Sequence, residues 1–130
     1  MLFFGHKFIE SKKFYHIFDI DAILKTPPAS TLYIEFSESN LDIINYMQQN
    51  QLRFALKVSN ITEVVYASAL NAAYIVVEDS LAKSAQSIAE NYLFDAKILT
   101  HIERENAIEE LALLGIDGVI FPNAIVHINS

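Results

Sequence analysis

The chain has 130 residues, of which 52% are hydrophobic, so it is long enough for one domain with a sizeable core. Its net charge of -7 and the absence of a lysine or arginine cluster exclude a basic nucleic-acid-binding surface. Because the chain has no cysteine, disulfides, thiolate metal sites and cysteine nucleophiles are also excluded.

The start of the chain has no basic region ahead of a long apolar run, so no secretory signal is expected. Its apolar runs are too short to cross a bilayer. We therefore expect a cytoplasmic protein without a membrane or nucleic-acid partner.

Residues 1–30 form an irregular, aromatic-rich segment that ends near Pro27 and Pro28. Residues 3–9 fit an edge strand, whereas residues 14–24 fit either a strand or a helix. The rings of this segment need a packing partner, and aromatic residues favour interfaces. We therefore expect a homodimer formed through this segment. The rings are Phe3, Phe4, Phe8, Phe14, Tyr15 and Phe18.

From residue 31 onward, strand and helix patterns alternate. Apolar and β-branched runs predict strands at residues 31–36, 52–58, 73–77, 97–102 and 118–121. Helical spacing predicts helices at residues 40–49, 60–70, 80–92 and 103–114. This alternation predicts βαβ units and a parallel sheet, and the middle strands lack the polar face of a half-exposed sheet.

The units show a hidden repeat. A shift of forty-four residues places Lys57 on His101 and Asn71 on Gly115. Asn71 and Gly115 are residue types that suit the left-handed position after a helix. The match indicates either an internal repeat or the general likeness of any two βαβ units.

These patterns predict a single α/β domain over residues 1–130. We expect three layers around a mainly parallel sheet of about five strands, in a flavodoxin-like or related topology. The alternative is a half (β/α) barrel that pairs with itself.

Polar residues gather where the predicted strands end, which is where sites form in parallel α/β proteins. A set with carboxylates, a lysine and a histidine can perform acid–base chemistry. Lys57 lies in an apolar strand, where it either acquires a depressed pKa or pairs with Glu35 or Glu78. The candidate catalytic residues are Glu35, Lys57, Glu78, Asp79 and His101.

No cofactor or metal is expected. No two histidines have metal-ligand spacing, and the chain has only three glycines and no phosphate-cradling loop.

The strand at residues 97–100, the helix after it and residues 115–122 resemble the last two units of response-regulator receiver domains. The resemblance implies that Glu78 or Asp79 lies near the phospho-acceptor position and that Thr100 is the conserved hydroxyl. Phe121 stands where that family has a lysine, which implies a pseudo-receiver that is not phosphorylated normally. Residues 115–118 also resemble the last units of (β/α)8 barrels, including glycerophosphodiesterases, whose His-Arg-Gly opening is absent.

The sequence favours a non-enzymatic binding or regulatory domain, a pseudo-receiver-like interaction module whose partner is itself or another protein. The alternative function is a small hydrolase or lyase that uses the candidate residues around a cleft at the strand ends.

Overall fold

The computed structural model describes residues 1–128, whose strands all join one parallel sheet. The order across the sheet is β1-β7-β6-β5-β4-β3-β2-β8. The strands are β1 (Leu2–Phe4), β2 (Phe14–His16), β3 (Thr31–Glu35), β4 (Phe54–Lys57), β5 (Tyr74–Val77), β6 (Lys97–His101), β7 (Gly118–Ile120) and β8 (Ile125–His127). The helices are α1 (Ile20–Ile23), α2 (Leu41–Gln49), α3 (Ile61–Ala69), α4 (Asp79–Asn91) and α5 (Ile108–Leu113). Short 3-10 turns are η1 (Glu38–Asn40), η2 (Glu105–Ala107) and η3 (Pro122–Ala124).

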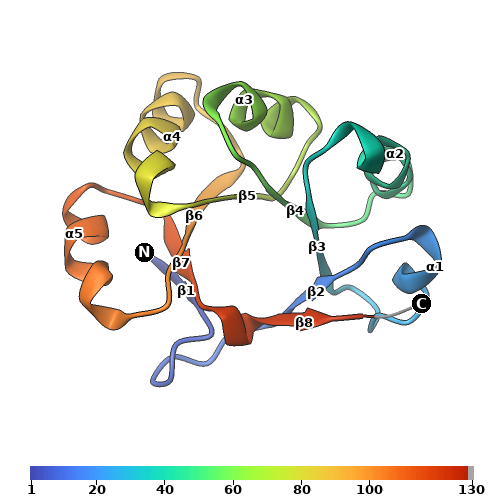
Figure 1. Ribbon diagram of the computed structural model, residues 1–130, viewed down its shortest axis with the longest axis horizontal. Helices are drawn as coiled ribbons and strands as arrows, with labels where there is room; N and C mark the ends of the chain where they lie inside the picture. The colour runs from blue at the N-terminus through green and yellow to red at the C-terminus, as the bar shows by residue number, and fades with distance from the viewer. Residues whose placement is uncertain (129–130) are drawn as a thin grey trace.

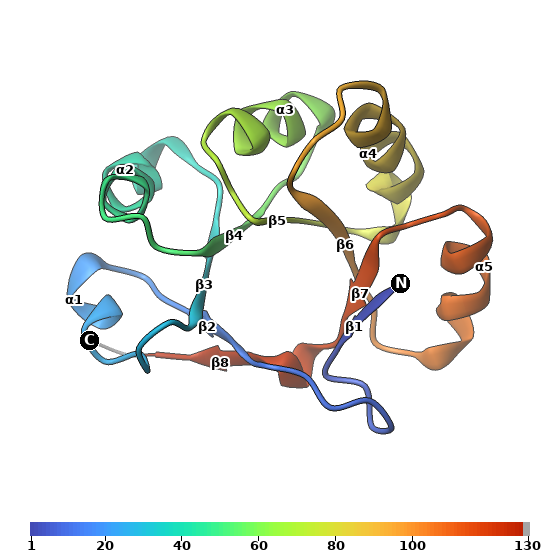
Figure 2. The same ribbon diagram turned by 180° about the vertical axis from the view of Figure 1, so that it is seen from behind.

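The sheet curls into a half-barrel with its helices on the outer face only (Figure 1). Seen from behind, α1 to α5 follow one another around the arc, and β8 spans the remaining side below them (Figure 2). The α/β class and the parallel sheet are therefore confirmed. The three-layer, flavodoxin-like arrangement is wrong, and the alternative of a half (β/α) barrel describes the chain.

The prediction of about five strands is also wrong, because the described residues contain eight. The additional strands are β1, β2 and β8, which have three residues each. For these strands, the sequence predicts an edge strand at residues 3–9 and a strand or a helix at residues 14–24, but no strand at β8. They extend the sheet at both of its edges, where β1 pairs with β7 and β8 pairs with β2.

Three aromatic rings hold the curled sheet together from the inside. The ring centroids of Phe4 and Phe14 are 4.9 Å apart, and those of Phe14 and Tyr74 are 5.4 Å apart. Phe4 also lies 5.5 Å from Tyr74. Both β1 and β2 are three strand positions from β5, which is about 14 Å in a flat sheet. These contacts are possible only because the sheet curls.

Two separate apolar clusters follow from this curl. The outer cluster lies between the sheet and its helices and includes Ile44, Met47, Leu56 and Ile98, each completely buried. The inner cluster lies inside the arc and is filled by side chains, as in the packed interior of a larger barrel. Its buried members are Phe14, Tyr33, Ala55, Val76, Leu99, Ile120 and Ala124.

Side chains of a strand alternate between its two faces, so the inner cluster shows which residues face inward. On β3 to β6 the middle inward residue belongs to this cluster, and polar or aromatic residues precede and follow it. The inward series, from the amino to the carboxyl end, are Thr31-Tyr33-Glu35, Arg53-Ala55-Lys57, Tyr74-Val76-Glu78 and Lys97-Leu99-His101. The half-barrel thus has one apolar layer inside and a polar group at each end.

The first thirty residues supply β1, β2 and α1 to this architecture. Phe14 is buried, and Phe3, Phe4 and Tyr15 are partly buried against the chain's own clusters. Phe8 and Phe18 remain 78% and 58% exposed. Most of the rings that suggested a second copy therefore pack within the chain. No helix among residues 1–128 has both the length and the apolar character needed to cross a membrane.

Left-handed residues end the helices at a nearly constant spacing. Asn71 and Gly115 have φ of 67° and 76°, so both predicted left-handed positions are confirmed. Gln51 and Leu93 follow α2 and α4 with φ of 56° and 53°. Each helix from α2 to α5 is therefore followed by one left-handed residue. The structural repeat is a single strand–helix unit, so the forty-four-residue shift found in the sequence spans about two such units.

We predict that Gly115→Ala lowers the free energy of unfolding by about 1 kcal/mol through backbone strain alone. A Cβ at this position meets no atom within 4 Å, so no clash contributes. Denaturant unfolding of the variant beside the parent chain measures the effect, and Ala112→Gly, at an exposed position within α5, is a control for helix propensity. An unchanged stability of Gly115→Ala would contradict the left-handed conformation.

Candidate functional site

Side chains from neighbouring strands meet at the carboxyl end of the half-barrel. Nζ of Lys57 on β4 donates to Oε1 of Glu78, which follows β5, at 2.7 Å. Glu35 on β3 is opposite Lys57 in the backbone register, yet the two side chains form no ion pair. The pairing of Lys57 with a neighbouring-strand carboxylate is thus confirmed, and the carboxylate is that of Glu78.

Tyr33 lies beneath these charges in the inner cluster and is 5% exposed. Burial raises the pKa of its hydroxyl above the usual 10.0, and the negative charges of Glu35 and Glu78 raise it further. The phenol therefore stays protonated at neutral pH and can act as a hydrogen-bond donor.

His16 on β2 adds an imidazole to this end of the sheet. The centroid of its ring lies 4.3 Å from the ring centroid of Phe18, 4.9 Å from that of Tyr33 and 5.2 Å from that of His127 on β8. Burial lowers the pKa of His16 below 6.5 and the nearby His127 lowers it further, while Glu35 has the opposite effect. The imidazole is therefore mainly neutral at pH 7.

The Nδ1 atom of His16 is buried and has no hydrogen-bond partner within residues 1–128. A neutral imidazole with an unpaired nitrogen can accept a proton or a hydrogen bond from a ligand. Sequence reasoning missed this residue because it lies in a three-residue strand of the N-terminal segment. The available signal was the alternation of Phe14 and His16 before the helix cap at Asp19, whose side chain accepts from the backbone of Ala22.

We call the group of Tyr33, Glu35, Lys57, Glu78, His16 and His127 the carboxyl-end cluster. Of the sequence candidates, it includes Glu35, Lys57 and Glu78. His101 ends β6 on the inward side, but its side chain forms no hydrogen bond or ion pair with any described residue. Asp79 is exposed in the first turn of α4 and is likewise outside the cluster.

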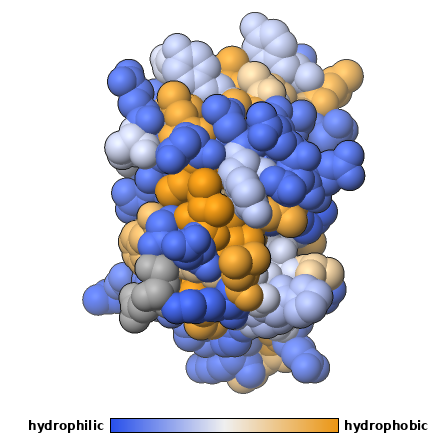
Figure 3. Space-filling view, turned by 90° about the vertical axis from the view of Figure 1, so that its right-hand side faces the viewer, coloured by the Kyte–Doolittle hydropathy of each residue, from blue (hydrophilic) through white to orange (hydrophobic). Residues whose placement is uncertain are grey.

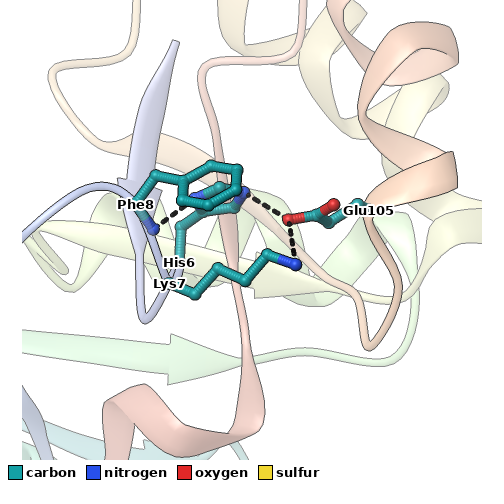
Figure 4. A network of polar contacts seen from close by, with 4 residues as sticks. All are labelled: His6, Lys7, Phe8 and Glu105. Atoms are coloured by element: carbon teal, nitrogen blue, oxygen red, sulfur yellow. Dashed lines mark hydrogen bonds and ion pairs between the residues drawn. The ribbon is translucent and has the colours of Figure 1, made fainter.

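A second polar group involves His6, which follows β1 (Figure 4). Its Nε2 lies 3.0 Å from Oε1 of Glu105, and its Nδ1 accepts a hydrogen bond from the backbone N–H of Phe8 at 3.1 Å. Nζ of Lys7 lies 3.6 Å from the same Glu105 oxygen. Both nitrogens of His6 are engaged, so this group attaches residues 5–13 to η2 and offers no available base.

The residues that resemble those of receiver domains lie elsewhere. Thr100 is completely buried on the outer side of β6, and its hydroxyl has no hydrogen-bond partner among residues 1–128. Phe121 is 8% exposed, and its ring lies 5.6 Å from that of His6. Neither residue belongs to the carboxyl-end cluster.

Within residues 1–128, no three histidine, aspartate or glutamate side chains are arranged to hold a metal ion. No protein-family model matches the chain, and no curated protein matches it either. The function is therefore inferred from the chemistry of the chain's own residues.

We predict that the imidazole of His16 titrates below pH 6.5 when followed by NMR. Glu35→Gln should lower this pKa further, because the carboxylate favours the charged imidazole, and His127→Gln should raise it. Since the folded-state pKa is below the unfolded value, stability falls as the pH falls below 6.5. A pKa of 6.5 or above in the parent chain would contradict this description of the site.

Proposed function

We propose that the protein is a non-enzymatic ligand-binding and regulatory domain that holds a small amine-bearing molecule in the carboxyl-end cluster. One observation carries the proposal. Glu35 is opposite Lys57 in the backbone register, but Lys57, the only lysine of the cluster, pairs with Glu78 instead. Because His16 is mainly neutral, the charge of Glu35 is not balanced by an ion pair.

The surrounding groups suit an organic cation. An ammonium group bound to Glu35 would form a charge-assisted hydrogen bond, which is stronger than a neutral one. The exposed ring of Phe18 packs on His16 and offers a flat apolar surface on which a ligand ring can stack. The protonated hydroxyl of Tyr33 is a donor for a polar substituent.

The proposed regulatory role depends on β8, which is the last strand at one edge of the sheet. This strand has three residues and, among residues 1–128, pairs with β2 alone, so few hydrogen bonds attach it to the sheet. His16 and His127 are opposite each other in this pairing. A ligand that contacts both rings would stabilise the last strand, and the state of β8 would then report ligand binding.

His16 also supports a second candidate function, a small hydrolase or lyase. Its neutral imidazole has a buried, unpaired Nδ1, and Tyr33 and Glu35 are beside it. A base of this kind can take a proton from water or from a substrate. Turnover that disappears in His16→Gln would favour this function over binding alone.

A protein partner stays part of the proposal. Figure 3 shows an apolar strip among hydrophilic side chains on the face at the right of Figure 1, where α1 and α2 lie. Leu24 beside α1 is 81% exposed, and Ile20 and Ile23 of α1 are only partly buried. A homodimer formed through this apolar strip would use a different surface from the aromatic N-terminal rings, through which the sequence predicts a homodimer.

We predict that benzylamine binds the parent chain and raises its melting temperature, whereas neutral benzyl alcohol has a much weaker effect. Glu35→Gln should weaken benzylamine binding about tenfold through loss of the charge-assisted contact. Calorimetric titration measures both affinities.

Glu38→Gln is the matched control, because it removes an exposed carboxylate from η1 without altering the carboxyl-end cluster. Equal benzylamine affinities for Glu35→Gln and Glu38→Gln would overturn the proposed site. Equal affinities of the parent chain for benzylamine and benzyl alcohol would overturn the proposed ligand class.

A further inference from the structure

The opposite, amino end of the half-barrel contains a hollow lined by cationic side chains. A cavity of about 500 Å³ is bordered there by Arg53, Tyr74, Lys97 and Asp95. A neighbouring cavity of about 540 Å³ shares Leu2, Arg53 and Tyr74 and continues to Lys12 and Lys13. Volumes of this size suit a small organic molecule.

Arg53 is held in place at the wall that the two cavities share. Its Nη2 donates to the Tyr74 hydroxyl at 3.0 Å, and its guanidinium carbon lies 5.1 Å from the centroid of the Tyr74 ring. Tyr74 is itself fixed by the rings of Phe4 and Phe14. A guanidinium fixed in this way loses little freedom on binding and has further N–H donors to offer.

The cations at this end are not neutralised within the described part of the chain. Neither Arg53 nor Lys97 forms an ion pair there, although Asp95 and Glu10 also line the cavities. Lys13 donates to the backbone carbonyl of Asn123 at 2.8 Å and forms no ion pair with a carboxylate of the described residues. Unpaired cations gathered around a hollow are unusual in a chain with a net charge of -7.

We propose that this amino-end cavity binds a small organic oxyanion, a phosphate or carboxylate group carried on an apolar body. Arg53 and Lys97 hold the oxyanion, because a guanidinium matches the geometry of phosphate and carboxylate oxygens. Leu2 lines both cavities and Phe4 lines the second one, and these two side chains would contact the apolar body. This site is independent of the amine-binding cluster at the other end.

Phenyl phosphate is a suitable probe. Inorganic phosphate and neutral phenol are the control ligands, because each represents one part of the probe. We expect phenyl phosphate to bind saturably and more tightly than either control ligand, and its affinity should fall as salt increases. Arg53→Gln and Lys97→Gln should each weaken it about tenfold. Lys83→Gln on the exposed side of α4 removes the same charge elsewhere and should leave the affinity unchanged.

Arg53→Lys keeps the charge but loses the fork of donors, so it should bind with intermediate affinity if the variant folds as the parent does. Backbone NMR shifts in the parent chain provide a test that needs no variant, and they should concentrate at Arg53, Tyr74 and Lys97. Absence of saturable binding up to about 10 mM would overturn the proposal. Equal affinities for phenyl phosphate and inorganic phosphate, or shifts located elsewhere, would also overturn it.

Discussion

The mutual contact of the Phe4, Phe14 and Tyr74 rings is the interaction on which the rest of the structure depends. It joins β1, at one edge of the sheet, to β2, next to the opposite edge, and joins both to β5 in the middle. Strands of three to five residues form few hydrogen bonds with their neighbours. Inside the arc, the buried ring of Phe14 packs against the partly buried rings of Phe4 and Tyr74. This packing supplies the apolar contact that such short strands cannot supply between themselves.

The same constraint explains why both ends of the half-barrel are polar. The inner face of each strand from β3 to β6 has room for one buried residue, with one residue before it and one after it. The residues after it supply Glu35, Lys57 and Glu78 to the carboxyl end, and those before it include Arg53 and Lys97. One end is therefore rich in carboxylates and imidazoles and the other in cations. This separation of charge supports the two proposed ligand sites, which differ in the charge of the ligand that each would bind.

The sequence predicted the parts of the fold that have many residues. The helices α2, α3 and α4 and the longer strands agree with the predicted ranges within a few residues, because their periodicity extends over whole turns or several alternations. The helix predicted at residues 103–114 is shorter, with α5 at Ile108–Leu113, and β8 was not predicted. The sequence offered the curled sheet only as the half-barrel alternative, because the curl depends on contacts between rings far apart in the chain. Of the site residues, Glu35, Lys57 and Glu78 were predicted from the strand ends. His16 was not, because residues 14–24 fitted a strand or a helix equally well and β2 has only three residues.

The sheet curls around an inner aromatic contact, and proton NMR tests this contact directly. We predict nuclear Overhauser cross-peaks between the ring protons of Phe14 and Tyr74 and between those of Phe4 and Tyr74, whose centroids are 5.4 and 5.5 Å apart. A flat parallel sheet with the same strand order places these rings about 14 Å apart and gives no such cross-peaks. Their absence from a well-resolved spectrum would contradict the half-barrel.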